Sequence, residues 1–175
     1  MDSVRAIASL YNEDFQYYKN FRPIKPEEIN SWNFKECVCA TYEYINTYFN
    51  QQRFFDRLEF MTCAKEAVLL LQKHYDIKIV SMGYTPNLIA KRLWLYRYLP
   101  GIPFVGVNLK EYKDKSHIDM KDAIFIDDNA RNLETSNAKK RYCFGEVKCW
   151  NDSWDGKRIN DWTDYKILLG KKYRK

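Results

Sequence analysis

The sequence has no long hydrophobic segment and no paired-cysteine motif. No apolar run approaches the roughly 20 residues that cross a bilayer, and the N-terminus shows no apolar core like that of a signal peptide. The five cysteines are odd in number, and none of them forms a Cys-x-x-Cys pair. This pattern favours free thiols in a reducing compartment over a disulfide framework. We therefore expect a cytoplasmic protein without a membrane partner.

Histidine is also scarce, and the chain has neither an internal repeat nor a low-complexity linker. His74 and His117 are the only histidines, and neither has the sequence spacing of a metal ligand or a triad partner. We expect both to be structural or surface residues. Cys37 and Cys39 fall in a helical pattern, so we expect them to pack rather than to bind a metal.

The composition is that of an ordinary globular protein. Charged residues make up 30% and hydrophobic residues 46% of the chain, values typical of globular domains. A length of 175 residues suits one α/β domain with a small appended cap. The formal net charge of +6 mildly favours anionic partners.

The most informative segment is Ala123–Asn129, a short apolar run followed by two adjacent carboxylates. A short run of β-branched and aromatic residues is typical of a central parallel strand. Ligands of open α/β sheets bind outside the carboxyl ends of the strands. Asp127 and Asp128 therefore lie where Mg²⁺ can be held by carboxylates and a phosphate together. The alternative is that one aspartate caps the next helix and the other is solvated.

The sequence pattern changes near residue 61. Residues 1–61 contain residues typical of helix ends and no clear strand pattern. We therefore expect a helical cap-like region that includes the first helix. From residue 62 to 175, helical and strand patterns alternate, which predicts an α/β core with a parallel, doubly wound sheet. We expect parallel strands near residues 77–81, 103–108, 122–127 and 141–145.

Three features in order along the chain resemble motifs II, III and IV of the haloacid dehalogenase (HAD) superfamily. They are a strand ending in Ser81, the later Lys115, and a strand ending in Asp127-Asp128. A closer resemblance is to the 5'(3')-deoxyribonucleotidase group (cytosolic type C). It is carried by residues 27–32, 53–55, 126–129 and 149–162. The resemblance implies a HAD-like (Rossmannoid) α/β fold with a parallel sheet and a small helical cap.

The resemblance also implies a role for each motif residue. Ser81 would donate a hydrogen bond to a phosphate oxygen, and Lys115 would neutralise phosphate charge during catalysis. Asp127 and Asp128 would bind Mg²⁺, directly or through water. The alternatives are that Ser81 is a plain turn residue and that Lys115 is a solvated loop lysine.

Aromatic residues make up 17% of the chain, and many of them lie in the first 61 residues. The resemblance to deoxyribonucleotidases implies that aromatic side chains of the cap stack on the nucleobase. Trp32 and Phe54 are the two candidates for this substrate-binding role. The alternative for any single aromatic residue is packing inside a compact helical cap.

The chain departs from the family at its defining motif I, a strand that ends in Asp-x-Asp. The first aspartate of that motif attacks phosphorus, and the second acts as general acid and base. No Asp-x-Asp occurs in the 175 residues. We interpret Asp2 as a helix N-cap or part of a frayed terminus rather than as a substitute for the motif.

The sequence therefore shows no pattern for the first core strand. In this superfamily, that strand lies between the strands that correspond to those ending in Ser81 and Asp127. Buried backbone groups that lack a partner are costly. We expect either that these two strands close on one another or that another segment or chain, in a homodimer or from a partner, completes the sheet. A third alternative is that the sequence is a truncated version of a longer product.

The resemblance implies hydrolysis of nucleoside monophosphates, deoxyribonucleotides above all, with Mg²⁺. Without the nucleophile, we expect the 175-residue chain to be inactive or nearly so. The alternative is a non-catalytic pseudo-phosphatase that binds a nucleotide or a protein. Only the positive charge and the aromatic content favour binding of nucleic acid, and we do not expect such binding.

Overall fold

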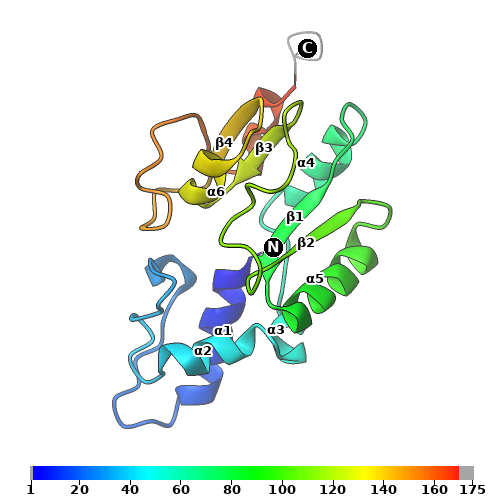
Figure 1. The fold of residues 1–175 in the computed structure, drawn as a ribbon. Coiled ribbons are helices and arrows are strands. Elements are labelled where there is room, and N and C mark those ends of the chain that lie inside the picture. Colours follow the sequence, from blue (N-terminus) through cyan, green and yellow to red (C-terminus); the bar gives the residue numbers. More distant parts are fainter. Residues whose placement is uncertain (1, 170–175) are drawn as a thin grey trace.

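The computed structural model describes residues 2–169 as a mixed α/β structure (Figure 1). The helical elements are α1 (Ser3–Phe15), η1 (Pro26–Glu28), α2 (Tyr42–Tyr48), α3 (Gln52–Asp56), α4 (Ala64–Leu71), α5 (Thr85–Tyr98), α6 (Ala130–Thr135) and η2 (Trp162–Ile167). The strands are β1 (Ile79–Gly83), β2 (Phe104–Asn108), β3 (Ile124–Asp127), β4 (Lys140–Phe144) and β5 (Arg158–Ile159).

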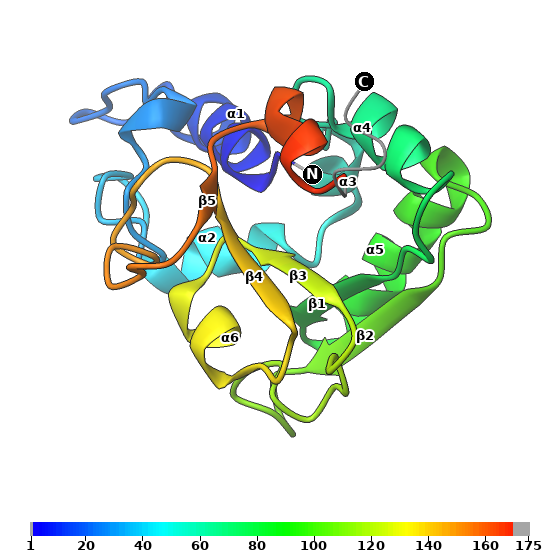
Figure 2. The ribbon, with the colours of Figure 1, turned by 90° about the horizontal axis from the view of Figure 1, so that it is seen from above.

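The strands form two separate parallel sheets. One contains β1 and β2, and the other has the order β3-β4-β5. Figure 2 shows β3 and β4 beside β1 and β2, while β3 has no ladder with β1 among the described residues. The predicted parallel α/β architecture is confirmed, and the four expected strands are observed within a few residues of their expected limits. The sequence patterns did not predict β5, which has only two residues.

Helices α5 and α6 support the strands that carry the predicted site. Helix α5 contacts β1 and β2, and α6 contacts β3 and β4. Thr85-Pro86 starts α5 directly after β1, with proline in the first turn, where the missing N–H costs nothing. Asn129 starts α6 directly after the aspartate pair, and its side chain accepts a hydrogen bond from Asn132 N. Both turns place the strand ends beside a helix N-terminus.

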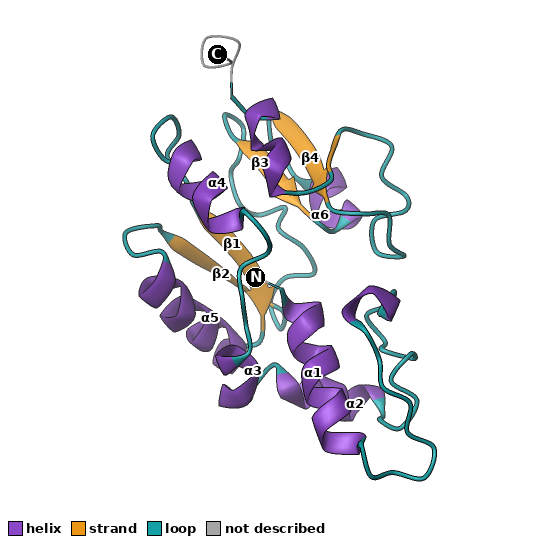
Figure 3. Ribbon diagram, turned by 180° about the vertical axis from the view of Figure 1, so that it is seen from behind, coloured by secondary structure: helices purple, strands orange, loops and turns teal. Residues whose placement is uncertain are grey.

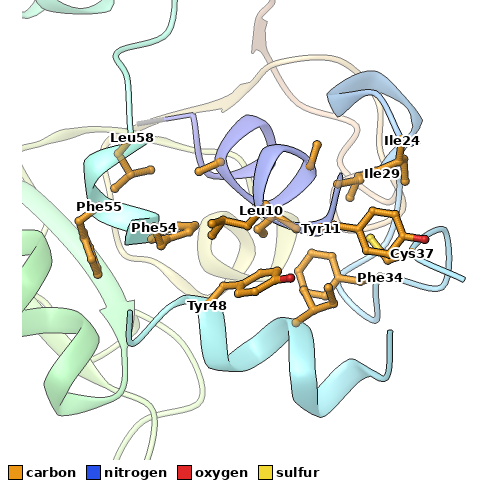
Figure 4. Close-up of a cluster of buried hydrophobic side chains, with 14 of the residues drawn as sticks. Leu10, Tyr11, Ile24, Ile29, Phe34, Cys37, Tyr48, Phe54, Phe55 and Leu58 are labelled. Atoms are coloured by element: carbon orange, nitrogen blue, oxygen red, sulfur yellow. The ribbon is translucent and has the colours of Figure 1, made fainter. Parts of the chain in front are cut away.

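Residues 2–61 form helices and loops without a strand (Figure 3). Asp2 is the N-cap of α1, and its carboxylate accepts the backbone N–H of Arg5, as expected for this position. The apolar face of α1 packs against α2 and α3 in the largest hydrophobic cluster of the described residues (Figure 4). Trp94 and Leu95 of α5 belong to the same cluster, so the core continues across the predicted boundary at residue 61.

Polar contacts tie the helices of this region together. Asp14 of α1 accepts two hydrogen bonds from the Arg53 guanidinium, both at 2.5 Å, and one from Tyr48 Oη at 2.8 Å. The hydrogen bond from Arg53 is the main reason why the pKa of Asp14 is lowered from its ordinary value. A charge-assisted, two-pronged pair of this kind is among the stronger side-chain contacts. It fixes α3 against α1.

Candidate functional site

Two lysine side chains donate hydrogen bonds to the carboxyl half of β1. Ser81 lies in β1, and its Oγ accepts a hydrogen bond from Lys91 Nζ at 3.0 Å. Lys91 Nζ also donates to the Met82 carbonyl oxygen at 2.9 Å. Lys115 Nζ donates to the Val80 carbonyl oxygen at 2.9 Å. Three consecutive residues of one strand end are therefore held by two ammonium groups.

Lys115 also connects the two sheets. Its Nζ lies 2.5 Å from Asp127 Oδ2 at the end of β3, and both side chains are buried. The loop around Lys115 is held by Asp114, whose carboxylate accepts the Ser116 N–H and contacts Arg131 Nε of α6. Lys115, from the loop between β2 and β3, thus links the strand that contains Ser81 to Asp127 at the end of β3.

Both carboxylate oxygens of Asp127 accept hydrogen bonds, whereas the neighbouring carboxylate of Asp128 accepts none from other side chains of the described residues. Asp127 Oδ1 accepts from Asn129 N at 2.9 Å and from Asn132 Nδ2 at 3.0 Å, so it both pairs with Lys115 and supports the turn into α6. The Asp128 side chain is reached by water, although protein atoms surround it on most sides. It accepts no side-chain hydrogen bond from the described residues, while its carbonyl oxygen accepts from Asn151 Nδ2.

Burial and neighbouring charges alter the titration of two groups in the site. Loss of hydration lowers the pKa of Lys91 to about 8, and repulsion from Lys115 contributes in the same direction. Loss of hydration and repulsion from Asp127 raise the pKa of Asp128. Asp128 attracts Lys91 at longer range, but neither group has an ion-pair partner within 4 Å among the described residues. An anion beside Lys91 or a cation beside Asp128 would stabilise its charged form.

The donor set of the aspartate pair fits a hard cation only in part. Mg²⁺ is commonly held by one or two carboxylates together with substrate phosphate and water. Asp128 offers an open carboxylate, but Asp127 already pairs with Lys115. The residues from 2 to 169 contain no group of three histidine, cysteine or acidic side chains that could hold a metal by themselves. A metal here would therefore depend on further ligands from phosphate and water.

The two aromatic candidates lie in different environments. Trp32 is 37% exposed and packs against Trp150, with ring centroids 4.9 Å apart. Trp150 belongs to the segment that follows β4, and its carbonyl oxygen accepts the N–H of Ala130 at the start of α6. Phe54 is only 1% exposed, and its ring contacts those of Phe49 and Phe55. Figure 4 shows Phe54 and Phe55 in the helical core. That position does not favour Phe54 as a base-stacking residue, since neither face of its ring is open.

Lys91 is the site residue that the sequence patterns did not single out. It lies on α5, ten residues after Ser81, and reaches back to the end of β1. The available signal was a lysine within the helix that follows a strand-end serine. That signal is weak, because Arg92 and Arg97 lie on the same helix.

Parallel strands flanked by helices, with serine and paired aspartates near their carboxyl ends, agree with the HAD-like α/β fold that the sequence predicts. Comparison with known proteins gives the family. Residues 1–173 match the family model described as 5' nucleotidase, deoxy (pyrimidine), cytosolic type C protein. The chain belongs to this family.

Two bacterial proteins illustrate the relationship. A putative 5'(3')-deoxyribonucleotidase of Staphylococcus epidermidis is 26% identical over 145 residues, which is 82% of this chain and 78% of that protein. A protein of the same description from Staphylococcus aureus (strain MSSA476) is 29% identical over 150 residues, 83% of this chain and 80% of the relative. The predicted family resemblance is confirmed. In the part of the chain that the structure describes, no helix is long and apolar enough to cross a membrane.

Proposed function

We propose that this chain binds the phosphate of deoxynucleoside monophosphates at the carboxyl ends of β1 and β3. The observation that carries the proposal is the convergence of Lys91 and Lys115 on the strand end that contains Ser81. A dianionic phosphate needs cations and hydrogen-bond donors at fixed positions. Two ammonium groups and a hydroxyl, held by a strand end, supply that combination.

Mg²⁺ completes the proposed site on the side of β3. Asp128 would bind the ion through its open carboxylate, and Asp127 would position Lys115 while contributing an oxygen directly or through water. When bound, the ion would neutralise phosphate charge. The exposed Trp32, whose ring packs at a tilt against that of Trp150, is the residue we propose for contact with the base. The five free cysteines support our proposal of a cytoplasmic location.

We further propose that the 175-residue chain does not hydrolyse this ligand at an enzymatic rate. Phosphoryl transfer in this family needs an attacking aspartate and a general acid, and the sequence has no Asp-x-Asp. Asp2 is engaged as the N-cap of α1 and makes an ion pair with Arg5. The chain thus keeps groups that position and neutralise phosphate and lacks the group that attacks it.

Ligand binding is tested by calorimetry with Mg²⁺ and a deoxynucleoside monophosphate. We expect Lys115→Met to weaken nucleotide binding at least tenfold, because a buried cation beside the phosphate is lost. The matched control is Lys113→Met, an exposed lysine two residues away, which should leave the affinity unchanged. We expect the double variant Asp127→Asn, Asp128→Asn to lose Mg²⁺ binding. Unchanged Mg²⁺ affinity in a folded double variant would refute the metal assignment.

Turnover is tested by comparing this chain with a version that is extended upstream by a strand carrying Asp-x-Asp. We expect no release of phosphate by the 175-residue chain and measurable release by the extended one. Robust turnover by the short chain that disappears in Asp2→Asn would show that Asp2 replaces the missing aspartate. Nucleotide binding by both versions with hydrolysis by neither would favour the pseudo-phosphatase alternative.

A further inference from the structure

A basic groove of about 510 Å³ lies between the start of β4 and the loop that precedes β5. Sites for small molecules commonly have volumes of ~300–1,000 Å³. Four cationic side chains and one partly exposed aromatic ring line the groove, namely Lys139, Lys140, Arg141, Lys157 and Trp154. None of these residues belongs to the candidate site described above.

The basic groove and the aspartate pair lie at opposite ends of the same sheet. In the parallel pairing of β3 with β4, Lys140 is set against Ile124, and Cys143 is set against Asp127. Lys140 is thus at the amino end of β4, whereas Asp127 is at the carboxyl end of β3. A ligand in the groove would therefore be separate from a phosphate bound at the candidate site.

The cations of the basic groove are not neutralised by nearby carboxylates. Among the described residues, no lysine or arginine of the groove has an ion-pair partner within 4 Å. Arg141 donates to the carbonyl oxygens of Leu133 and Glu134, which are neutral acceptors. The side chains of Glu134 and Asp155 also line the groove, so four positive charges face two negative ones. The remaining excess of two positive charges favours an anionic ligand.

The indole ring of Trp154 is held in place by three contacts. Its Nε1–H donates to the Lys157 carbonyl oxygen at 3.1 Å. The guanidinium carbon of Arg141 lies 5.7 Å from the centroid of the ring. A Cβ atom at Gly156 would lie 2.5 Å from Trp154 Cζ2, so the ring approaches the backbone where only glycine leaves enough space. A ligand that packs on this ring would lose little free energy in ordering it.

Cations beside a fixed aromatic ring are suited to a nucleotide. Lysine and arginine donate charge-assisted hydrogen bonds to phosphate oxygens. A nucleobase stacks on an aromatic side chain, and this contact does not require a particular base. A triphosphate spreads its negative charge over several groups, so it can reach more of the four cations than a monophosphate can. The groove therefore favours a nucleotide with several phosphate groups.

We propose that the basic groove binds one nucleoside triphosphate, with the base against Trp154 and the phosphates at the lysines and Arg141. Single-stranded nucleic acid fits less well, since such a strand stacks successive bases on several aromatic rings. Among the described residues that line the groove, Trp154 is the aromatic side chain that reaches solvent, whereas Tyr142 is 6% exposed. The proposal does not depend on nucleotide binding at β1 and β3, because the two sites share no residue.

The test uses the full 175-residue chain and deoxyadenosine triphosphate without metal. Calorimetry measures binding, and NMR follows the indole N–H of Trp154 and the backbone amides of Lys140 and Lys157. We expect these three signals to shift in proportion to the bound fraction, whether or not the amides of Ser81 and Asp127 also shift. Absence of binding, or shifts confined to Ser81 and Asp127, would overturn the proposal.

Control ligands separate the contributions of the base and the phosphates. Inorganic tripolyphosphate should bind at least fivefold more weakly than the nucleotide, because it has no base to stack. Deoxyadenosine, which has no phosphate, should not shift the three signals measurably. Equal affinity of tripolyphosphate would overturn the contact with the base, and equal affinity of deoxyadenosine would overturn the contact with the phosphates. Tighter binding of a single DNA strand of about 12 nucleotides, with the same signals shifted, would assign the groove to nucleic acid and overturn the proposal.

Two variants and a matched control test the location. Lys139→Met combined with Lys140→Met should weaken binding of deoxyadenosine triphosphate at least tenfold. Lys73→Met, which changes an exposed lysine outside the groove, should leave the affinity unchanged. Gly156→Ala should weaken binding at least threefold without a change of charge, because the methyl group displaces the indole. Unchanged affinity in the folded lysine variant, as judged by circular dichroism, would exclude the groove as the site. If Gly156→Ala does not fold, tripolyphosphate still decides whether the base is bound.

Discussion

The helical region and the sheet region of this protein differ in how completely they are packed. In the helical region, Tyr11, Tyr48 and Phe54 are at most 1% exposed, and the partly exposed Asp14–Arg53 pair joins α1 to α3. In the sheet region, most of β1 is half-buried, and an apolar cavity separates it from β3. The difference indicates that side chains fill the core of the helical region more completely than that of the sheet region.

The largest expected effect would come from truncating a core side chain of the helical region. We expect Phe54→Ala to lower the free energy of unfolding by about 3–5 kcal/mol, because the surrounding rings cannot close the space. The half-buried Val80→Ala should cost less than about 1 kcal/mol. Urea denaturation of both variants measures the contrast. Equal losses would show that β1 is packed as tightly as the helical core.

The Asp14–Arg53 pair predicts an acid-sensitive contribution of the helical region. The pKa of Asp14 is lowered in the folded state, so its contribution is present above the ordinary carboxylate pKa and disappears as the pH falls through the lowered value. We expect Arg53→Met to cost about 1–3 kcal/mol at pH 7. The cost should decrease below pH 4, as measured by thermal unfolding between pH 2 and 7. A cost independent of pH would show that the pair contributes through packing alone.

Lys91 predicts a second increase of stability with pH, in the sheet region and in the alkaline range. Its pKa is about 8 in the folded state and about 10.5 when solvated, so the unfolded chain binds more protons between these values. Stability should therefore rise by about 2–3 kcal/mol from pH 8 to 10.5 and be lost again as the pH falls through 8. We expect Lys91→Met to flatten this part of the stability profile. Arg92→Met, on the same helix, should retain it.

Much of the fold could be predicted because strand periodicity and proline positions are local signals. The short apolar runs before Ser81 and Asp127, and Thr85-Pro86 at the start of α5, identify their elements without tertiary information. The two-residue β5 has no such signal, since its pairing depends on where β4 already lies. Phe54 and Trp32 could not be separated by sequence, because either aromatic residue can pack or stack. Lys91 reaches the site only through the position of α5 on β1.

The ammonium groups on Val80 O and Met82 O also bear on self-association. An open strand edge recruits other chains, and lysine near an edge discourages this recruitment. The carboxyl half of β1 is guarded in this way, whereas the described residues place no comparable cation on Ile124 O or Ile126 O of β3. The two edges therefore differ in their exposure to aggregation. Of these two edges, that of β3 is the more open to pairing with another copy of the protein, whereas the lysines protect that of β1.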